Sequence, residues 1–455
     1  MSDAGARLSI QELQADVAAD RIDTVIVGFT DMQGRLQGKR IHGRFFVDEV
    51  LHHGTEGCNY LLAVDVDMNT VDGYAMSSWS TGYGDFVMNP DLSTLRRIPW
   101  IDGTALVIAD LAWHDGTPVV ASPRQILARQ VEALNNAEMA AFVGTELEFI
   151  VFEDSFEEAW DNGYRDLTPA NRYNVDYSLL GGTKVEPLLR AIRRGMDGAG
   201  MTVESVKGEC NLGQHEIAFK YAQATETCDN HVLYKTGAKE IASEFGCSLT
   251  FMAKYDQREG NSCHIHLSFR GLDGNPVMAD DAGRFGMSAL GEAFVAGQLA
   301  RMKELTLMFA PNINSYKRFQ AGSFAPTAIK WGHDNRTCAL RLVGHGLGLR
   351  LENRVPGGDV NPYLAVAGMI AAGMDGITRG LTLEDPFEGN AYAADAEHVP
   401  DSLLAAKDLW SQSEWIEQTF GAEVQAHYTN MAKVELDAFG ATVTGWERRR
   451  GFERM

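Results

Sequence analysis

Three short segments of this chain alternate ionisable and apolar residues, and this pattern constrains the fold more than any other feature. The segments are VGTELEFIVF, NSCHIHLSF and LRLENR, which lie far apart along the sequence. Because successive side chains of a β-strand point to opposite faces, each segment places its ionisable groups on one face and its apolar groups on the other. Taken alone, each segment is typical of a strand with a solvated face. Taken together, the segments indicate a curved sheet, held by helices, whose polar face lines a cavity.

The polar face would bring carboxylates, imidazoles and guanidinium groups together. A fourth segment, KGECNLGQHE, adds a carboxylate on each side of a glycine-containing bend. The residues concerned are Glu146, Glu148, Glu209, Glu216, His264, His266, Ser268, Arg350, Glu352 and Arg354. Carboxylates that face one cavity would repel one another strongly unless divalent cations lay among them. Oxygen-rich sites with an imidazole suit Mg²⁺ or Mn²⁺ better than Zn²⁺, and arginines bind phosphate and carboxylate groups bidentately.

Metal ions combined with an arginine cluster are typical of sites that catalyse phosphoryl transfer. The chain contains no GxxxxGK[ST] motif, so a nucleotide would bind outside a P-loop. A metal-dependent hydrolase is an alternative, although a water nucleophile would not require several arginines. The formal charge of −22 argues against nucleic acid as a partner, because the phosphates of a nucleic acid would be repelled.

The length of 455 residues is too great for one ordinary core and predicts two domains. Residues 22–40 are typical of a strand, a turn and a return strand, and residues 104–113 of a further strand. Downstream, short predicted strands alternate with longer helices. We therefore predict a small β-rich domain over residues 1–113 and a larger catalytic domain over residues 114–455.

Neither export nor membrane insertion is indicated by the chain. The first residues, MSDAGARLSIQELQAD, carry acids where a signal peptide would carry an apolar core. The longest apolar run, residues 365–374, is about half as long as a membrane span. The six cysteines are scattered without a CxxC pair, as expected of reduced thiols. These features predict a cytoplasmic protein that does not bind membranes.

The order of the motifs along the chain closely resembles that of the glutamine synthetase family. The order is ExE, E-x6-E, NSCHIHLS, YKR…NRT…R and RLENR followed by PGGDVNPYLA, with FTDMQGRLQGKR and DFVMNPDLST nearer the start. The resemblance implies an α+β protein with a small β-grasp N-terminal domain. It further implies a catalytic domain built on a curved antiparallel sheet flanked by helices. The implied assembly is a homo-oligomer, a dodecamer of two hexameric rings.

The same resemblance implies a reaction and a set of site residues. ATP phosphorylates the γ-carboxylate of glutamate and an amine then displaces phosphate, with two or three Mg²⁺ or Mn²⁺ ions per subunit. One ion would be held by Glu148, Glu209 and Glu216, and another by Glu146, His264 and Glu352. ATP would contact Glu204, His266, Ser268, Arg336, Arg341 and Arg350, with Arg336 stabilising the transferring phosphoryl group. Glutamate would be held by Gly260, His264, Arg318 and Arg354.

One loop departs from the family pattern. Typical members have a Gly-aromatic-Glu-Ala-Pro run there, whose Glu takes a proton from ammonium, whereas this chain has Phe324 in the Glu position. A phenyl ring removes an acceptor for ammonium and supplies an apolar wall, so we predict that the acceptor is an organic amine. This resembles the γ-glutamyl-amine ligase branch of the family, whose acceptors include ethanolamine and polyamines. The alternative is a true glutamine synthetase that uses ammonia, in which Phe324 is only a change of packing.

The predicted acceptor pocket contains Phe324, Ser323, Tyr177 and Asp72. A further departure places Glu259 where the family has an Asn. Hydroxyl-bearing residues near the departures slightly favour ethanolamine over a polyamine, which would need several anionic anchors. Either Glu209 or a water would take the proton of the amine. A non-catalytic nitrogen sensor or scaffold is a further alternative, but it predicts the loss of metal ligands or phosphate-binding arginines, and none of these is lost.

Overall fold

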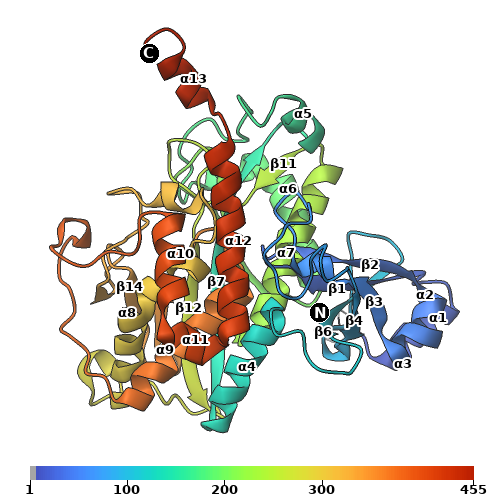
Figure 1. The fold of residues 1–455 in the computed structure, drawn as a ribbon, viewed down its shortest axis with the longest axis horizontal. Coiled ribbons are helices and arrows are strands. Elements are labelled where there is room, and N and C mark those ends of the chain that lie inside the picture. Colours follow the sequence, from blue (N-terminus) through green and yellow to red (C-terminus); the bar gives the residue numbers. More distant parts are fainter. Residues whose placement is uncertain (1–6) are drawn as a thin grey trace.

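The computed structural model describes residues 7–455, which form two β-sheets covered by helices (Figure 1). Residues 1–6, which open the segment used above to predict the absence of a signal peptide, lie outside the described residues. The smaller sheet is built from the N-terminal part of the chain, and the larger one carries the polar face predicted from the sequence.

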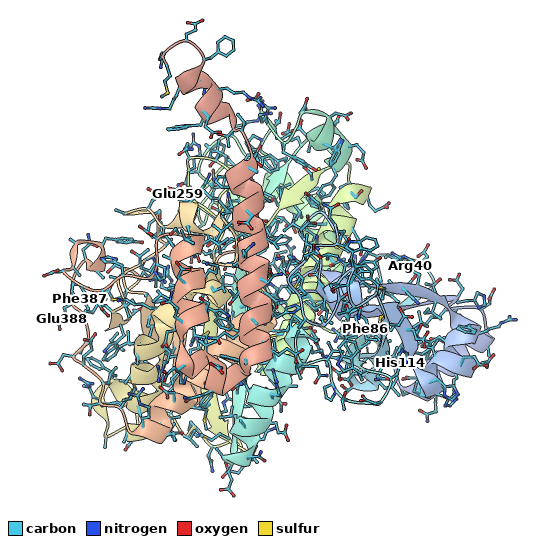
Figure 2. The ribbon with its side chains drawn as sticks, viewed as in Figure 1. Arg40, Phe86, His114, Glu259, Phe387 and Glu388 are labelled. Atoms are coloured by element: carbon cyan, nitrogen blue, oxygen red, sulfur yellow. The ribbon has the colours of Figure 1, made fainter. Side chains whose placement is uncertain are left out.

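The smaller sheet has six strands and a compact apolar core. Its strands in spatial order are β2 (Leu36–His42), β1 (Thr24–Thr30), β6 (Thr104–Ala112), β4 (Asp85–Pro90) and β3 (Thr55–Cys58), with β5 (Arg96–Arg97) also paired to β6. β1 pairs antiparallel with β2, as the strand-turn-strand pattern predicts, and parallel with β6. Phe86, labelled in Figure 2, is fully buried and packs edge-on against Phe29 at 5.5 Å between ring centroids. Three helices, α1 (Ile10–Ala18), α2 (Gly43–Phe45) and α3 (Leu51–His53), accompany this sheet.

The larger sheet has nine strands. In spatial order they are β13 (Trp331–His333), β14 (Leu340–Val343), β15 (Arg350–Asn353), β12 (Cys263–Gly271), β7 (Met139–Phe152), β9 (Gln214–Phe219) and β8 (Val203–Gly208), with β10 (Ala222–Gln223) and β11 (Ser248–Thr250) beside β7. Every pair is antiparallel except β13 and β14. Residues 334–339 return the chain to the start of β14 instead of forming a hairpin, so the sheet predicted to be antiparallel is mixed.

Helices cover the apolar face of the larger sheet (Figure 1). The helices of this part of the chain are α4 (Pro123–Asn136), α5 (Phe156–Asp161), α6 (Leu179–Gly198), α7 (Ala224–Glu244), α8 (Ala289–Phe309), α9 (Pro362–Arg379), α10 (Leu403–Gln412), α11 (Glu414–Phe420), α12 (Ala422–Ala441) and α13 (Gly445–Gly451). Of these, α10 packs on α8 and α12, and α13 projects away from the rest of the molecule (Figure 1). Leu147, Ile265 and Leu351 are at most 1% exposed and belong to this core. The apolar run of residues 365–374 is the buried centre of α9. Across residues 7–455, no helix combines the length and apolar character needed to cross a membrane.

A buried arginine connects the two sheets. Arg124, near the start of α4, forms ion pairs with Asp91 at 2.7 Å and Asp110 at 2.6 Å, both from the smaller sheet, and with Asp229 of α7 at 3.0 Å. Tyr363 donates a hydrogen bond to the same Asp229 at 2.6 Å. The predicted boundary after residue 113 lies in the connection between β6 and α4. We retain that boundary, and the β-grasp description of the first domain, as proposals.

A buried histidine on α12 lies against the N-terminal part of the chain. His427 is 5% exposed, and its Nε2 lies 2.9 Å from the sulfur of Met32. Its ring centroid is 4.6 Å from that of Tyr74. Burial lowers the pKa of His427 from an ordinary value of 6.5 to about 4.

We expect His427 to make the fold sensitive to acid. Since the folded-state pKa lies below 6.5, the unfolded chain binds the extra proton, and stability that is full above this pH is lost as the pH falls toward 4. The loss between pH 7 and pH 5 should be about 2 kcal/mol. His427→Gln should therefore lose less thermal stability than the wild type over this interval, as measured by scanning calorimetry. Equal losses in the two proteins would contradict the assignment.

Candidate active site

The strand register places the predicted polar residues beside one another on one face of the larger sheet. Directly opposed residues in antiparallel strands have side chains on the same face, about 5 Å apart. The opposed pairs are His264–Glu146, Glu148–Glu216, Lys207–Glu216, His266–Glu352 and Arg341–Glu352. The alternation read from the sequence is therefore confirmed on all of the strands concerned.

Two cavities open on this face and share Glu146. The first, of about 230 Å³, is lined by thirteen of the predicted residues: Glu146, Glu148, Tyr177, Glu209, Glu216, Gly260, His264, Ser323, Phe324, Arg336, Arg341, Glu352 and Arg354. The second, of about 290 Å³, is lined by Glu204, His266, Ser268 and Arg350 together with Glu146. The structure thus separates four of the predicted ATP contacts, on β8, β12 and β15, from the residues of the first cavity, across one shared carboxylate.

The first group of carboxylates could hold a divalent ion. One oxygen from each of Glu148, Glu209 and Glu216 lies within 4.8 Å of the others. Glu148 accepts hydrogen bonds from the backbone N–H of Ser262 at 2.7 Å and from Gln214 Nε2 at 3.2 Å, which fix its orientation. Burial and the charges of neighbouring carboxylates raise the pKa of Glu216 to about 8. A bound cation would remove this electrostatic cost, so the donor set fits Mg²⁺ or Mn²⁺.

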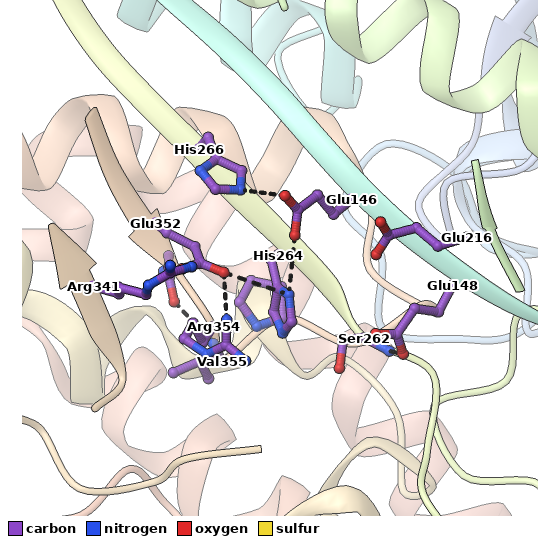
Figure 3. A network of polar contacts seen from close by, with 12 residues as sticks. Glu146, Glu148, Glu216, Ser262, His264, His266, Arg341, Glu352, Arg354 and Val355 are labelled. Atoms are coloured by element: carbon purple, nitrogen blue, oxygen red, sulfur yellow. Dashed lines mark hydrogen bonds and ion pairs between the residues drawn. The ribbon is translucent and has the colours of Figure 1, made fainter. Parts of the chain in front are cut away.

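A second group lies around Glu146 and Glu352 (Figure 3). His264 Nδ1 lies 3.4 Å from Glu146 and 3.5 Å from Glu352, whereas His266 Nε2 lies 3.0 Å from Glu146. Arg350 donates to His266 Nδ1 at 3.2 Å, so a neutral His266 ring carries its proton on Nε2. Burial and Arg354 lower the pKa of His264, which favours the neutral form that binds metals. By distance, His266 completes a group with Glu146 and Glu352 in which each residue offers an atom within 4.8 Å of the others. His264, the predicted ligand, lies between the same two carboxylates.

Arginines surround the fully buried carboxylate of Glu352. Arg341 lies 3.0 Å from it, and Arg354 forms a second, closer ion pair. Although burial opposes the shift, the neighbouring imidazole of His264 and guanidinium of Arg354 hold the pKa of Glu352 below its ordinary value. Arg336 lines the same cavity and is exposed. These side chains place several positive charges opposite the acidic groups, which is suited to an anionic substrate.

The second cavity combines polar groups with flat side chains. The guanidinium of Arg270 lies 4.3 Å from the ring centroid of Phe142 and 5.1 Å from that of Tyr221. Arg270 also donates to the hydroxyl of Tyr221 at 3.1 Å. Planar walls of this kind stack on a planar heterocycle. Neither Tyr221 nor Arg270 was predicted from the sequence, where nothing distinguishes them from other strand-end residues.

The loop that departs from the family pattern projects its aromatic ring at the first cavity. Phe324 is 55% exposed and has a φ of 57°, in the left-handed region that a bulky residue adopts only at a cost. Gly322, two residues earlier, has a φ of 76°. The hydroxyl of Ser323 donates to the backbone carbonyls of Arg318 and Gln320, which closes the turn. Tyr177, also with a left-handed φ, is 72% exposed and lines the same cavity.

Two predicted residues line neither cavity. Arg318 is 1% exposed, and its guanidinium donates to the carbonyls of Val355, Arg354 and Pro356 at 3.0, 3.2 and 2.8 Å. In this structure it holds the backbone that carries Arg354, and its role as a direct glutamate contact stays a prediction. Asp72 is exposed, and its carbonyl accepts a hydrogen bond from Asn430 of α12. Its loop docks on that helix, so Asp72 does not reach the acceptor pocket of its own chain.

The structure also adds residues that the sequence interpretation missed. Lys207, Gln214 and Ser262 line the first cavity, and each lies two positions before a predicted residue on its strand or bend. The same alternation rule, extended by one step, would have found them. Asp176 and Cys210 belong to loops at the acceptor end and left no periodic pattern in the sequence.

Comparisons with known proteins agree with this geometry. Residues 120–451 match the family described as glutamine synthetase, catalytic domain. The chain belongs to the glutamine synthetase family. It is 66% identical over 448 residues to a γ-glutamylethanolamide synthetase, GlnA4, of Streptomyces coelicolor, covering 98% of this chain and 96% of that protein. It is 35% identical over 434 residues to a glutamate–isopropylamine ligase of a Pseudomonas species, covering 94% and 95% of the two chains.

The fold comparison leads to the same family. A solved GmaS–ADP complex superposes with a TM-score of 0.85 and 27% sequence identity, covering 97% of this chain and 99% of that one. The resemblance to the family and to its γ-glutamyl-amine ligase branch is confirmed, as is the overall fold class. The chain is a ligase of this family, as predicted.

The first carboxylate group yields a direct test of the metal assignment. Glu148→Gln keeps the size of the side chain and an oxygen for the N–H of Ser262 but removes the charge. We expect the affinity for Mn²⁺ at this group to fall by roughly 100-fold, since even indirect partners of metal ligands change affinity about 10- to 100-fold. Calorimetric titration with Mn²⁺ measures the change. Glu153→Gln, at an exposed site just after β7, is the matched control, and an unchanged affinity in Glu148→Gln would refute the assignment.

Proposed function

We propose that this family member joins the γ-carboxylate of glutamate to an organic amine, with ATP as the phosphoryl donor and γ-glutamyl phosphate as the intermediate. The observation that carries the proposal is the position of Phe324, an exposed ring beside a cavity that otherwise contains carboxylates, histidine and arginines. We propose ethanolamine as the acceptor. The 66% identity to a protein named for γ-glutamylethanolamide supports this choice.

The two cavities suggest how the substrates are arranged. The base of ATP fits the second cavity, between the polar groups of β12 and the flat side chains of Tyr221 and Arg270. Its phosphates would extend past Glu146 toward Arg336 and Arg341 in the first cavity. Divalent ions held by the two carboxylate groups would offset the negative charge of the phosphates. Arg336, which is exposed at this position, would stabilise the phosphoryl group during transfer.

Glutamate and the amine would meet at the other end of the first cavity. Arg354 is positioned to bind a carboxylate of glutamate, and Gly260 lines the cavity with only backbone. The rings of Phe324 and Tyr177 offer the amine an apolar wall and cation–π contacts. Glu209 faces the same space and is the group we propose as the acceptor of the proton from the amine. The cytoplasmic location and the dodecameric assembly remain predictions.

The proposed function predicts a specific acceptor profile. Purified protein with ATP, glutamate and Mg²⁺ should release phosphate rapidly with ethanolamine. It should release little with ammonium, putrescine, spermidine or isopropylamine. A phosphate-release assay over this panel measures the profile, and mass spectrometry identifies the amide. Turnover with ammonium alone would establish a glutamine synthetase instead, and absence of turnover with every amine would favour a sensor or scaffold.

Phe324 should determine the choice of acceptor. Phe324→Glu supplies a carboxylate that can accept hydrogen bonds from ammonium, so we expect kcat/KM for ammonium to rise about tenfold or more. The same change should lower kcat/KM for ethanolamine. Phe324→Leu, which keeps an apolar side chain without charge, is the control and should retain the amine preference. No gain with ammonium in Phe324→Glu would argue against a role for Phe324 in specificity.

A further inference from the structure

A lysine of this chain lies on two carboxylates of the first metal-binding group. Lys207 is the residue of β8 directly opposite Glu216 of β9. Its ammonium forms a close ion pair with Glu209 and lies 3.7 Å from Glu216. Within residues 7–455, it is the one lysine paired with a carboxylate of either metal-binding group. It therefore differs from the arginines, which pair with Glu352 in the other group.

A divalent ion and this ammonium would use the same oxygens. Mg²⁺ and Mn²⁺ bind carboxylate oxygens at about 2.0 to 2.3 Å and carry two positive charges. An ammonium in contact with Glu209 would then be repelled at short range while it also occupies oxygen lone pairs. The two cations therefore cannot share Glu209 and Glu216 in the arrangement seen here.

The surroundings of Lys207 offer its ammonium a second partner, which it already contacts in this arrangement. The Nζ atom lies 5.1 Å from the ring centroid of Tyr177, which lines the acceptor end of the cavity. A cation–π contact with this ring would require neither carboxylate. The side chain of Lys207 is 25% exposed and long enough to turn toward the ring without movement of β8.

We propose that Lys207 is an internal counter-cation that competes with a divalent ion for Glu209 and Glu216 and so weakens metal binding at the first group. The inference rests on the metal site of the proposed function but not on the identity of the amine. Lys207 is then a positioning residue, because it acts through the carboxylates that bind the ion. It balances the carboxylates until the ion binds and then moves to the acceptor end.

The experiment compares metal binding in three variants of the full-length protein. Lys207→Met removes the charge and keeps an unbranched chain, whereas Lys207→Arg keeps the charge. Lys220→Met alters an exposed lysine just after β9 and is the matched control. The probe is Mn²⁺ alone, and free Mn²⁺ is measured by electron paramagnetic resonance. Thermal midpoints are recorded in parallel with chelator and with saturating Mg²⁺.

We expect Lys207→Met to bind one Mn²⁺ roughly tenfold more tightly than the wild type. The factor is modest because solvent screens most of the repulsion between the ammonium and the ion. Its thermal midpoint should fall with chelator and recover with Mg²⁺. Lys207→Arg and Lys220→Met should bind Mn²⁺ as the wild type does. Unchanged or weaker binding in Lys207→Met, or equally tight binding in Lys207→Arg, would overturn the proposal. Absence of Mn²⁺ binding in the wild type would instead refute the metal site of the proposed function.

Discussion

Repulsion between carboxylates on one face of the larger sheet is the constraint on which the rest of the structure depends. Glu146, Glu148 and Glu216 are fixed by the strand register, and the fold cannot separate them without breaking the sheet. Their charges have to be balanced from outside the strands or by bound cations. The raised pKa of Glu216, about 8, shows that the residues alone leave this balance incomplete. The arginines, the histidines and Lys207 are arranged around this unpaired charge.

The groups of the site that serve different steps lie on different kinds of secondary structure. The groups for metal and phosphate chemistry lie on paired strands, whose geometry is rigid. The groups at the acceptor end, Tyr177, Ser323 and Phe324, lie on loops, and two of them hold strained backbone conformations. If these loops select the amine, as proposed, a change in them would alter the amine that fits without disturbing the strands. The similarity of this chain to one protein named for an ethanolamide product and another named for an isopropylamine substrate agrees with that separation.

The strand residues of the site could be predicted from the sequence because side-chain alternation has a fixed period of two. Burial of Leu147 places Glu146 and Glu148 together on the opposite face of the strand. Burial of Ile265 does the same for His264 and His266. The relative direction of two paired strands has no such local signature, so the parallel pair of β13 and β14 was not foreseen. Arg318 and Asp72 line neither cavity for a related reason. Their surroundings are set by tertiary contacts with residues 354–356 and with α12, which no local pattern records.

The acceptor end of the first cavity has a negative electrostatic potential, which would affect how an amine reacts there. Burial, together with the charges of Asp176 and Glu259, raises the pKa of the Cys210 thiol to about 11. The negative potential responsible for this shift also attracts an alkylammonium ion, so it would concentrate the amine in the cavity. The same potential stabilises the protonated amine, which has no lone pair for attack on an acyl phosphate. In the proposed reaction, recognition and reactivity therefore oppose each other at this end of the cavity, and a base is needed close to the bound amine. Glu209, which lines the cavity next to Cys210 in the chain, is the base that we propose for this step.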